Sequence, residues 1–149
     1  MEIRAVHHAG HTVKDMPRSL AFYRDMLGLT VVDDAVLEGP EISAMIGLQD
    51  ASLRAVFLGV DGNPPFVELI EYYRPHGRPL AGTETVADVG NAHFSFLVSD
   101  IHATIEELKR KGVRFVGPPL LGDDGPFEGE WAAYCYDPDG MVVEWWEAR

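Results

Sequence analysis

The chain has 149 residues, of which 46% are hydrophobic, and its formal net charge is −12 at pH 7. This length suits one well-buried domain or two half-domains that share a core. The acidic balance argues against nucleic acid or an anionic membrane as a partner, and no apolar run reaches the roughly 18 residues of a membrane span. A single cysteine allows no internal disulfide, so we expect a cytoplasmic protein.

The first half of the chain is predicted to form a strand, a helix and three further strands. Asp15 is a candidate helix N-cap, and Gly28 is a stop signal for the same helix. The turn signal "DGNPP" separates the last two strands. The expected elements are a strand at 3–13, a helix at 14–28, a strand at 29–36, a short helix or turn at 39–48, and strands at 52–60 and 64–73.

The second half follows a segment at 74–90 that is rich in proline and glycine and is predicted to be a connection. Beyond it the order of strand and helix signals is repeated, and "DPDG" marks the turn of a final hairpin. The expected elements are a strand at 91–98, a helix at 99–112, a strand at 113–117, a loop at 118–130, and hairpin strands at 131–137 and 141–147.

The two halves correspond residue by residue at their starts and at their ends. "VELIE" near the end of the first half matches "VEWWE" near the end of the second. The matching residues at the starts are His8, Val13 and Asp15 in the first half and His93, Val98 and Asp100 in the second. We therefore predict an α+β fold of two βαβββ modules, residues 1–73 and 91–149, joined by residues 74–90.

Each predicted module contains one histidine in its first strand and one glutamate in its last strand. Strand alternation places His8 on the face of Gly10 and Thr12, and it directs His7 and His11 to the opposite face as structural residues. If the modules pair about a pseudo-twofold axis, two imidazoles and two carboxylates converge, which is a mixed N/O site for a divalent metal. The four predicted ligands are His8, Glu68, His93 and Glu144. A cation there compensates carboxylates that apolar strands otherwise disfavour.

Three stretches, "HHAGHTVKDMPRSLAFYRDMLGL", "AHFSFLVSD" and "DPDGMVVE", resemble the vicinal oxygen chelate superfamily. This superfamily includes glyoxalase I, methylmalonyl-CoA epimerase, extradiol dioxygenases, fosfomycin-resistance enzymes and bleomycin-resistance proteins. The resemblance covers essentially the whole chain and implies that the modules pair into an open, cupped, eight-stranded mixed sheet with helices outside. It also implies one divalent metal ion (Ni, Co, Zn, Mn or Fe) on the same four ligands, a small-molecule substrate and a homodimer.

The resemblance further implies a metal-dependent lyase or isomerase of the glyoxalase or epimerase type, in which a glutamate moves a proton. We assign that role to Glu144, or to Glu68 by the pseudosymmetry. Thr12 and Tyr72 stand where the glyoxalase I pattern has arginine and asparagine, so glutathione is not the expected substrate. Arg54 stands near the place of the epimerase base and is predicted to hold a substrate carboxylate, with a structural salt bridge as the alternative.

Two other functions stay open at this level. "YCYDPDGMVVE" fits the extradiol dioxygenase signature except for its upstream histidine, which is missing. A bleomycin-resistance-like protein that holds an aromatic compound without a metal is the second alternative. Trp146, which shares a strand face with Glu144, and Tyr134 of the signature are the predicted substrate contacts in addition to Arg54.

Overall fold

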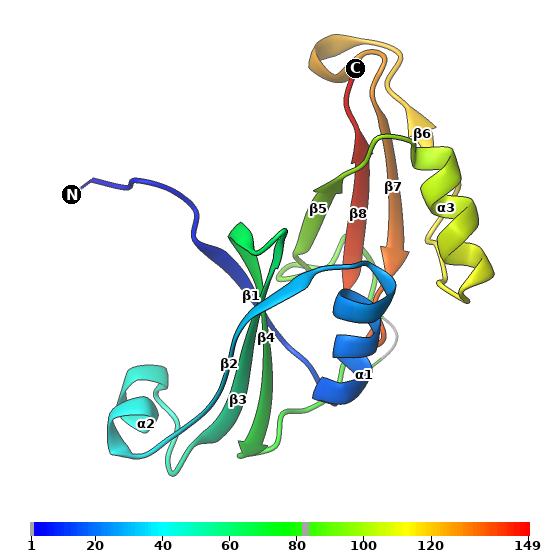
Figure 1. Cartoon of the computed structure of the whole chain (residues 1–149). Coiled ribbons are helices and arrows are strands. Elements are labelled where there is room, and N and C mark those ends of the chain that lie inside the picture. The colour runs from blue at the N-terminus through cyan, green and yellow to red at the C-terminus, as the bar shows by residue number, and fades with distance from the viewer. Residues whose placement is uncertain (1, 82–83) are drawn as a thin grey trace. The chain divides into compact units, whose positions relative to one another are not determined.

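The computed structural model describes residues 2–81 and 84–149 (Figure 1). The chain divides into two compact units, Met1–Pro79 and Leu80–Arg149. The division falls inside the predicted connecting segment 74–90, of which residues 82–83 lie outside the described part. Residue 1 of the predicted first module also lies outside it.

The first unit is built on a four-stranded mixed sheet in the order β1-β4-β3-β2. The pair β1 and β4 is parallel, and the other two pairs are antiparallel. The elements in chain order are β1 (His8–Thr12), α1 (Met16–Leu20), the π-helix η1 (Ala21–Met26), β2 (Thr30–Glu38), α2 (Pro40–Ile46), β3 (Ser52–Val60) and β4 (Asn63–Arg74).

The second unit repeats this topology with the strand order β5-β8-β7-β6 (Figure 1). Its parallel pair is β5 and β8. The elements are β5 (His93–Leu97), α3 (Ile101–Arg110), β6 (Leu120–Leu121), the 3₁₀ turn η2 (Gly125–Phe127), β7 (Trp131–Tyr136) and β8 (Val142–Glu147). The α+β fold with two βαβββ modules is confirmed. Pairing of their sheets into one eight-stranded layer stays a prediction.

The prediction of a strand at 113–117 is wrong. This segment makes backbone hydrogen bonds from Val116 N–H to Tyr134 and from Tyr136 N–H to Arg114, but it holds only an isolated bridge. The next two residues are prolines, which have no N–H group to extend such a ladder. The short strand β6 forms after them, in the segment predicted to be a loop.

The predicted helix at 14–28 contains a change of helix type that the sequence pattern does not predict. Asp15 caps α1 through a hydrogen bond from the Arg18 N–H, as expected, and Gly28 ends the helical segment with φ of 81°. Between them, residues 21–26 follow the wider π-helical path. One residue more separates Asp15 from Gly28 than separates the corresponding Asp100 from Gly112 in the second module. The wider turn accommodates this extra residue.

Each sheet has one apolar face, and a helix of the same module contacts that sheet. Cys135 of β7 lies on this face of the second sheet, fully buried, and accepts a hydrogen bond from the Trp145 indole N–H at 3.2 Å. Burial raises the pKa of the Cys135 thiol to about 11, so it stays a protonated, packed group. The buried residues of this face are Val56, Leu58, Val67 and Leu69 in the first sheet and Ala133, Cys135, Val143 and Trp145 in the second.

The repeated motifs "VELIE" and "VEWWE" also dock the helices. Glu71 accepts a hydrogen bond from the N–H of Met16, the first residue of α1, at 3.4 Å. Glu147, at the same place in the second motif, accepts one from the N–H of Ile101, the first residue of α3, at 2.6 Å. Free N–H groups and the helix dipole make a helix start favourable for a carboxylate. The second glutamate of each motif therefore fixes a helix to the last strand of its module.

We expect Glu147→Gln to lower the free energy of unfolding by about 1 kcal/mol at neutral pH, because the amide keeps an acceptor but loses the charge at the helix start. The matched variant Glu71→Gln removes the charge from a longer hydrogen bond, so its effect should be smaller. Urea unfolding measures both. Equal stability of wild type and Glu147→Gln contradicts the docking role of this carboxylate.

Candidate metal centre

In the first module, His8 and Glu68 meet on the face of the sheet that is opposite to the apolar face. The strand β1 pairs in parallel with β4, and Gly10 is the direct partner of Glu68. His8, two residues earlier on β1, therefore projects from the same face as Glu68. The distance from His8 Nε2 to Glu68 Oε2 is 3.4 Å, and the two side chains are 39% and 17% exposed.

The second module places His93 and Glu144 in the same relation. Ser95 is the direct partner of Glu144 in the parallel pair of β5 and β8. The distance from His93 Nε2 to Glu144 Oε2 is again 3.4 Å, and the side chains are 43% and 10% exposed. His93 and Tyr134 also line a small hollow of this module, together with Val86, Asn91 and Val142.

The repeated separation fits two ligands of one cation better than a direct ion pair. A charge-assisted N–H···O hydrogen bond measures about 2.7–2.9 Å. Two ligand atoms held about 2.1 Å from one tetrahedral cation lie about 3.4 Å apart. In both modules imidazole Nε2 and the carboxylate oxygen are 3.4 Å apart, the separation expected for two ligands of one cation. Neutral imidazole and carboxylate are also the donors that divalent transition metals bind.

Each module by itself offers two donors of the predicted set. No group of three or more His, Cys, Asp or Glu side chains is close enough to share a metal ion within the part of the chain that the structure describes. A centre that uses all four predicted ligands therefore needs both modules, and their joint site stays a prediction.

Gly10 makes room for the Glu68 carboxylate. A Cβ atom built on Gly10 would lie 2.7 Å from Glu68 Oε2, which is closer than carbon and oxygen approach without displacement. The second module has Ser95 at the corresponding position. The glycine therefore allows the Glu68 carboxylate to lie directly against β1.

The two pairs differ in the residue opposite the glutamate on the neighbouring strand. Phe57 pairs with Glu68, and Tyr134 pairs with Glu144. Each aromatic ring lies beside the histidine of its module, at 5.3 Å for Phe57 and His8 and 5.2 Å for Tyr134 and His93. Burial, the Glu144 charge and a hydrogen bond to Glu144 raise the pKa of Tyr134, so its hydroxyl stays protonated and donates to that carboxylate. Of the two residues opposite the glutamates, Tyr134 has a hydroxyl and Phe57 has none.

Trp146, a predicted substrate contact, lies on the Glu144 face of β8, two residues further along the strand. Its indole N–H donates to Glu130 Oε2 at 2.6 Å, and its ring contacts Phe127 edge to face at 5.2 Å. The loop before β7 is therefore fixed against the same face of the sheet as the His93–Glu144 pair. The neighbouring Trp145 is buried on the apolar face.

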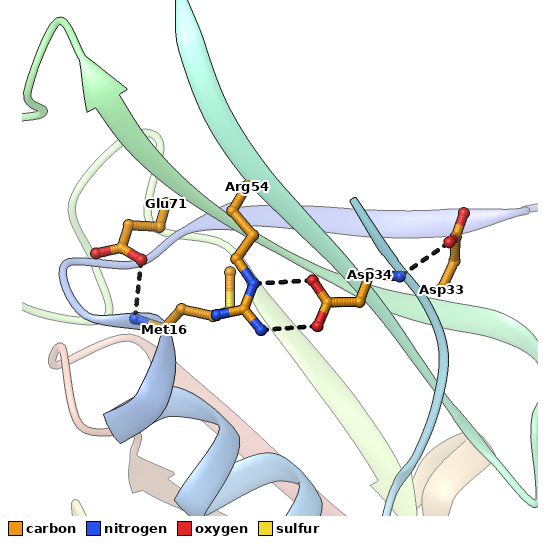
Figure 2. A network of polar contacts seen from close by, with 5 residues as sticks. All are labelled: Met16, Asp33, Asp34, Arg54 and Glu71. Atoms are coloured by element: carbon orange, nitrogen blue, oxygen red, sulfur yellow. Dashed lines mark hydrogen bonds and ion pairs between the residues drawn. The ribbon is translucent and has the colours of Figure 1, made fainter. Parts of the chain in front are cut away.

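Arg54, the other predicted substrate contact, lies on the opposite face of its sheet from Glu68. It makes two hydrogen bonds to Asp34 across β2 and β3, at 2.8 and 2.7 Å, on the side where Glu71 meets the start of α1 (Figure 2). The guanidinium lowers the pKa of Asp34 through these hydrogen bonds. The structure therefore brings Arg54 to a carboxylate of its own sheet and does not bring it to the His8–Glu68 pair.

The orientation predicted for His7 is wrong. The strand β1 begins at His8, so the alternation that places His7 on the opposite face does not apply. The His7 ring instead contacts Phe66 at 5.4 Å, and its Nδ1 lies 2.8 Å from Nδ1 of His8. His11, by contrast, is buried against Tyr23 on the helix side, as expected of a structural histidine. The adjacent pair "HH" is the sequence signal from which a neighbour for His8 could have been predicted.

Two repeats of a βαβββ module, each with a His–Glu pair on the open face of its sheet, define the class of protein. Residues 5–145 match the Glyoxalase/Bleomycin resistance protein/Dioxygenase superfamily. The chain belongs to this superfamily, which confirms the resemblance seen in the sequence. In the described ranges 2–81 and 84–149, no helix has the length and apolar character to cross a membrane.

Individual relatives agree with this membership. A 2-epi-5-epi-valiolone epimerase from Actinomyces sp is 30% identical over 145 residues, which cover 94% of this chain and 77% of the relative. The lactoylglutathione lyase-like protein terB from Aspergillus terreus is 28% identical over 148 residues, and the match covers 93% of this chain and 73% of the relative. A crystal structure of a glyoxalase family protein from Bacillus cereus has a TM-score of 0.84 at 19% identity, over 99% of this chain and 96% of that one, which shows the shared fold.

We expect Arg54→Met and Asp34→Asn each to lower stability by about 0.5 kcal/mol, the size typical of an exposed ion pair. Because the pKa of Asp34 is lowered, this contribution is present at neutral pH and is lost as the pH falls through that lowered pKa. Thermal unfolding at pH 7 and pH 3 measures the effect. Since the pair lies away from Glu68, both variants should bind metal and small molecules as wild type does. Weaker small-molecule binding in Arg54→Met alone contradicts this placement and supports the substrate contact predicted from the sequence.

Proposed function

We propose that this protein is a divalent-metal-dependent isomerase or lyase of the glyoxalase and epimerase type, which moves a proton on a small substrate with oxygen donors. The observation that carries the proposal is the pair of His–Glu contacts, each with a nitrogen-to-oxygen separation of 3.4 Å. The proposed ligands are His8, Glu68, His93 and Glu144. A bound cation supplies positive charge beside the oxygens of the substrate and stabilises the negative charge that develops there.

The low exposure of the two carboxylates supports a cation. Glu144 is 8% exposed as a residue, and the Glu68 side chain is 17% exposed. A carboxylate that is withdrawn from water needs a compensating charge, and the neutral form of histidine does not provide one. The protein as a whole, with a net charge of −12, does not supply this compensating positive charge either. One divalent ion compensates both carboxylates at once.

The difference between the two pairs suggests which glutamate moves the proton. A base must turn from its position beside the histidine toward a carbon atom of the substrate. The Tyr134 hydroxyl holds the Glu144 carboxylate, whereas Phe57 has no hydroxyl to hold Glu68. We therefore assign proton transfer to Glu68 and a fixed ligand role to Glu144. The sequence favours Glu144 for this role, with Glu68 as the alternative by pseudosymmetry, and the environments of the two carboxylates favour Glu68.

The relatives support proton transfer at carbon as the reaction class. An epimerase inverts one carbon centre, and removal and return of a proton is a direct route to that result. The epimerase from Actinomyces sp is similar over nearly all of this chain. Trp146 and Tyr134, on the face of the His93–Glu144 pair, are the proposed contacts for the body of the substrate. The compound named for that epimerase is a reasonable first substrate to test.

A dioxygenase of the extradiol type is the second candidate. The observation in its favour is that Tyr134 of the signature stretch lies beside His93 and donates to Glu144. Oxygen chemistry needs open positions on iron, and Glu68 as a fourth protein ligand takes one of them. Iron dependence and inactivation in air would favour this candidate, whereas an isomerase should work with Ni, Co, Mn or Zn.

The metal centre is tested by metal analysis of the purified protein after incubation with Ni²⁺ or Co²⁺ and desalting. We expect one equivalent per pair of modules, and we expect His8→Ala and His93→Ala each to lose most of it. His102→Ala removes an exposed histidine of α3 and is the matched control. Wild-type protein without metal, with small-molecule binding that a chelator does not affect, contradicts the proposal and indicates a binding protein.

The proton-transfer assignment is tested by deuterium uptake from D₂O into 2-epi-5-epi-valiolone at saturating metal. We expect Glu68→Gln to lower the rate by about 10²–10⁴-fold, the contribution of a general base. Glu144→Gln should weaken metal binding, and added metal should restore part of its rate. If Glu144→Gln is the variant that stays inactive at saturating metal while Glu68→Gln exchanges normally, the roles are reversed.

We expect Gly10→Ala to weaken binding of Ni²⁺ by about tenfold, the low end of the effect of residues that support a metal ligand. The new methyl group takes the space of the Glu68 carboxylate oxygen, 2.7 Å away. Ser95→Ala, at the corresponding position beside Glu144, adds no atom and should bind as wild type does. Competition with a chromophoric chelator gives both affinities. An unchanged affinity in Gly10→Ala means that Glu68 does not bind the cation in the position seen here.

A further inference from the structure

The contact between His7 and His8 is a short hydrogen bond between two imidazole rings. Nδ1 of His7 and Nδ1 of His8 are 2.8 Å apart, and the ring centroids are 5.1 Å apart in an edge-to-face arrangement. The other nitrogen of His8, Nε2, faces Glu68 at 3.4 Å. When both rings are neutral, the Nδ1 contact holds one proton, which belongs to one of the two rings.

The position of that proton decides which nitrogen of His8 has a free lone pair. If His8 carries it on Nδ1 and donates to His7, then Nε2 of His8 is unprotonated toward Glu68. If His7 donates, then His8 must be protonated on Nε2, and no lone pair faces Glu68. Histidine in water prefers the form with the proton on Nε2, so the form that can bind a cation through Nε2 needs support from a neighbour.

We infer that His7 is a positioning residue for His8: its Nδ1 accepts the His8 Nδ1–H, fixes that ring and leaves Nε2 of His8 free to bind the cation. The inference rests on the proposed metal site and adds to it a residue that the four ligands do not include. A metal-bound histidine almost always donates its second ring N–H to a fixed acceptor. Here that acceptor is the residue immediately before the ligand.

The surroundings of His7 support this role. Its ring is held by edge-to-face contacts with Phe66, at 5.4 Å, and with Phe57, at 6.3 Å. The strand β1 begins at His8, and the His7 carbonyl still accepts a backbone hydrogen bond from the Phe66 N–H at 2.9 Å. The His7 backbone is thus held beside β4 while its ring lies against His8. The second module has Ala92 before His93, and alanine has no side-chain acceptor. The support is therefore specific to the first module, and His93 is an internal control in the same protein.

The first experiment determines the protonated nitrogen of each ring. Long-range ¹H–¹⁵N spectra of the metal-free protein, at a pH where the rings are neutral, distinguish the two forms of histidine. We expect His8 to carry its proton on Nδ1 in wild type and to shift toward Nε2 in His7→Leu, while His93 does not change. His7→Asn places a side-chain oxygen near the former position of Nδ1 and should restore the wild-type form. A packing role alone does not distinguish leucine from asparagine in this way.

The second experiment measures the affinity for Co²⁺ by competition with a chromophoric chelator. We expect His7→Leu to bind about tenfold more weakly than wild type and His7→Asn to recover most of the loss. Leucine and asparagine are similar in size, so a common loss in both variants reflects packing and overturns the inference. Equal affinity of His7→Leu and wild type overturns it as well.

The two experiments separate failure of this inference from failure of the proposed metal site. If wild type binds no Co²⁺, the proposed function fails, and the spectra alone then decide the role of His7. A His8 ring that is protonated on Nε2 in the metal-free wild type shows that His7 is the donor, and it overturns the inference whether or not metal binds.

Discussion

An ionised carboxylate in a mostly apolar strand is stable only if a partner compensates its charge, and the last strand of each module contains two of them. In both motifs the glutamates are three residues apart, an odd number, so they leave opposite faces of the strand. Glu71 and Glu147 bind the starts of the helices, while Glu68 and Glu144 face the histidines. One short sequence thus attaches a helix to one side of the sheet and presents a candidate metal ligand on the other. The position of the site is therefore coupled to the docking of the helix.

The sequence predicts the arrangement inside each module well because the relevant rules are local. Alternation along a strand and the internal repeat place each histidine beside its glutamate. The misses arise where contacts depend on the end of an element or on register between strands. His7 lies just outside β1, so alternation does not describe it. For Arg54 the sequence left a structural salt bridge open beside a substrate contact, but it did not give Asp34 as the partner. That partner depends on the alignment of β2 with β3, which shifts at an irregularity between Val31 and Asp33. The role of Glu71 and Glu147 depends on where each helix begins in space, which strand periodicity does not contain.

The modules are copies in topology but not in the chemistry around their His–Glu pairs. The first has Gly10, Phe57 and His7 around its pair, and the second has Ser95, Tyr134 and Ala92 at the corresponding places. In the first pair the histidine contacts His7 and the glutamate lies opposite a phenylalanine, whereas in the second pair the glutamate lies opposite a tyrosine that donates to it. A reaction that moves one proton needs only one mobile base, and a symmetric site offers two equivalent ones. Divergence between the halves is a physical route to distinct roles for chemically identical candidate ligands.

The π-helical turn in η1 allows the first helical segment to be one residue longer than its counterpart while both sheets keep the same strand order. An additional residue in a regular α-helix rotates everything beyond it by about 100°. Here the wider turn takes up the surplus residue between a capping aspartate and a left-handed glycine that match those of the other half. The downstream strands then keep the same order as their counterparts. A helix of this kind can therefore differ in length by one residue between the two modules while the strands that contain the candidate ligands keep their order.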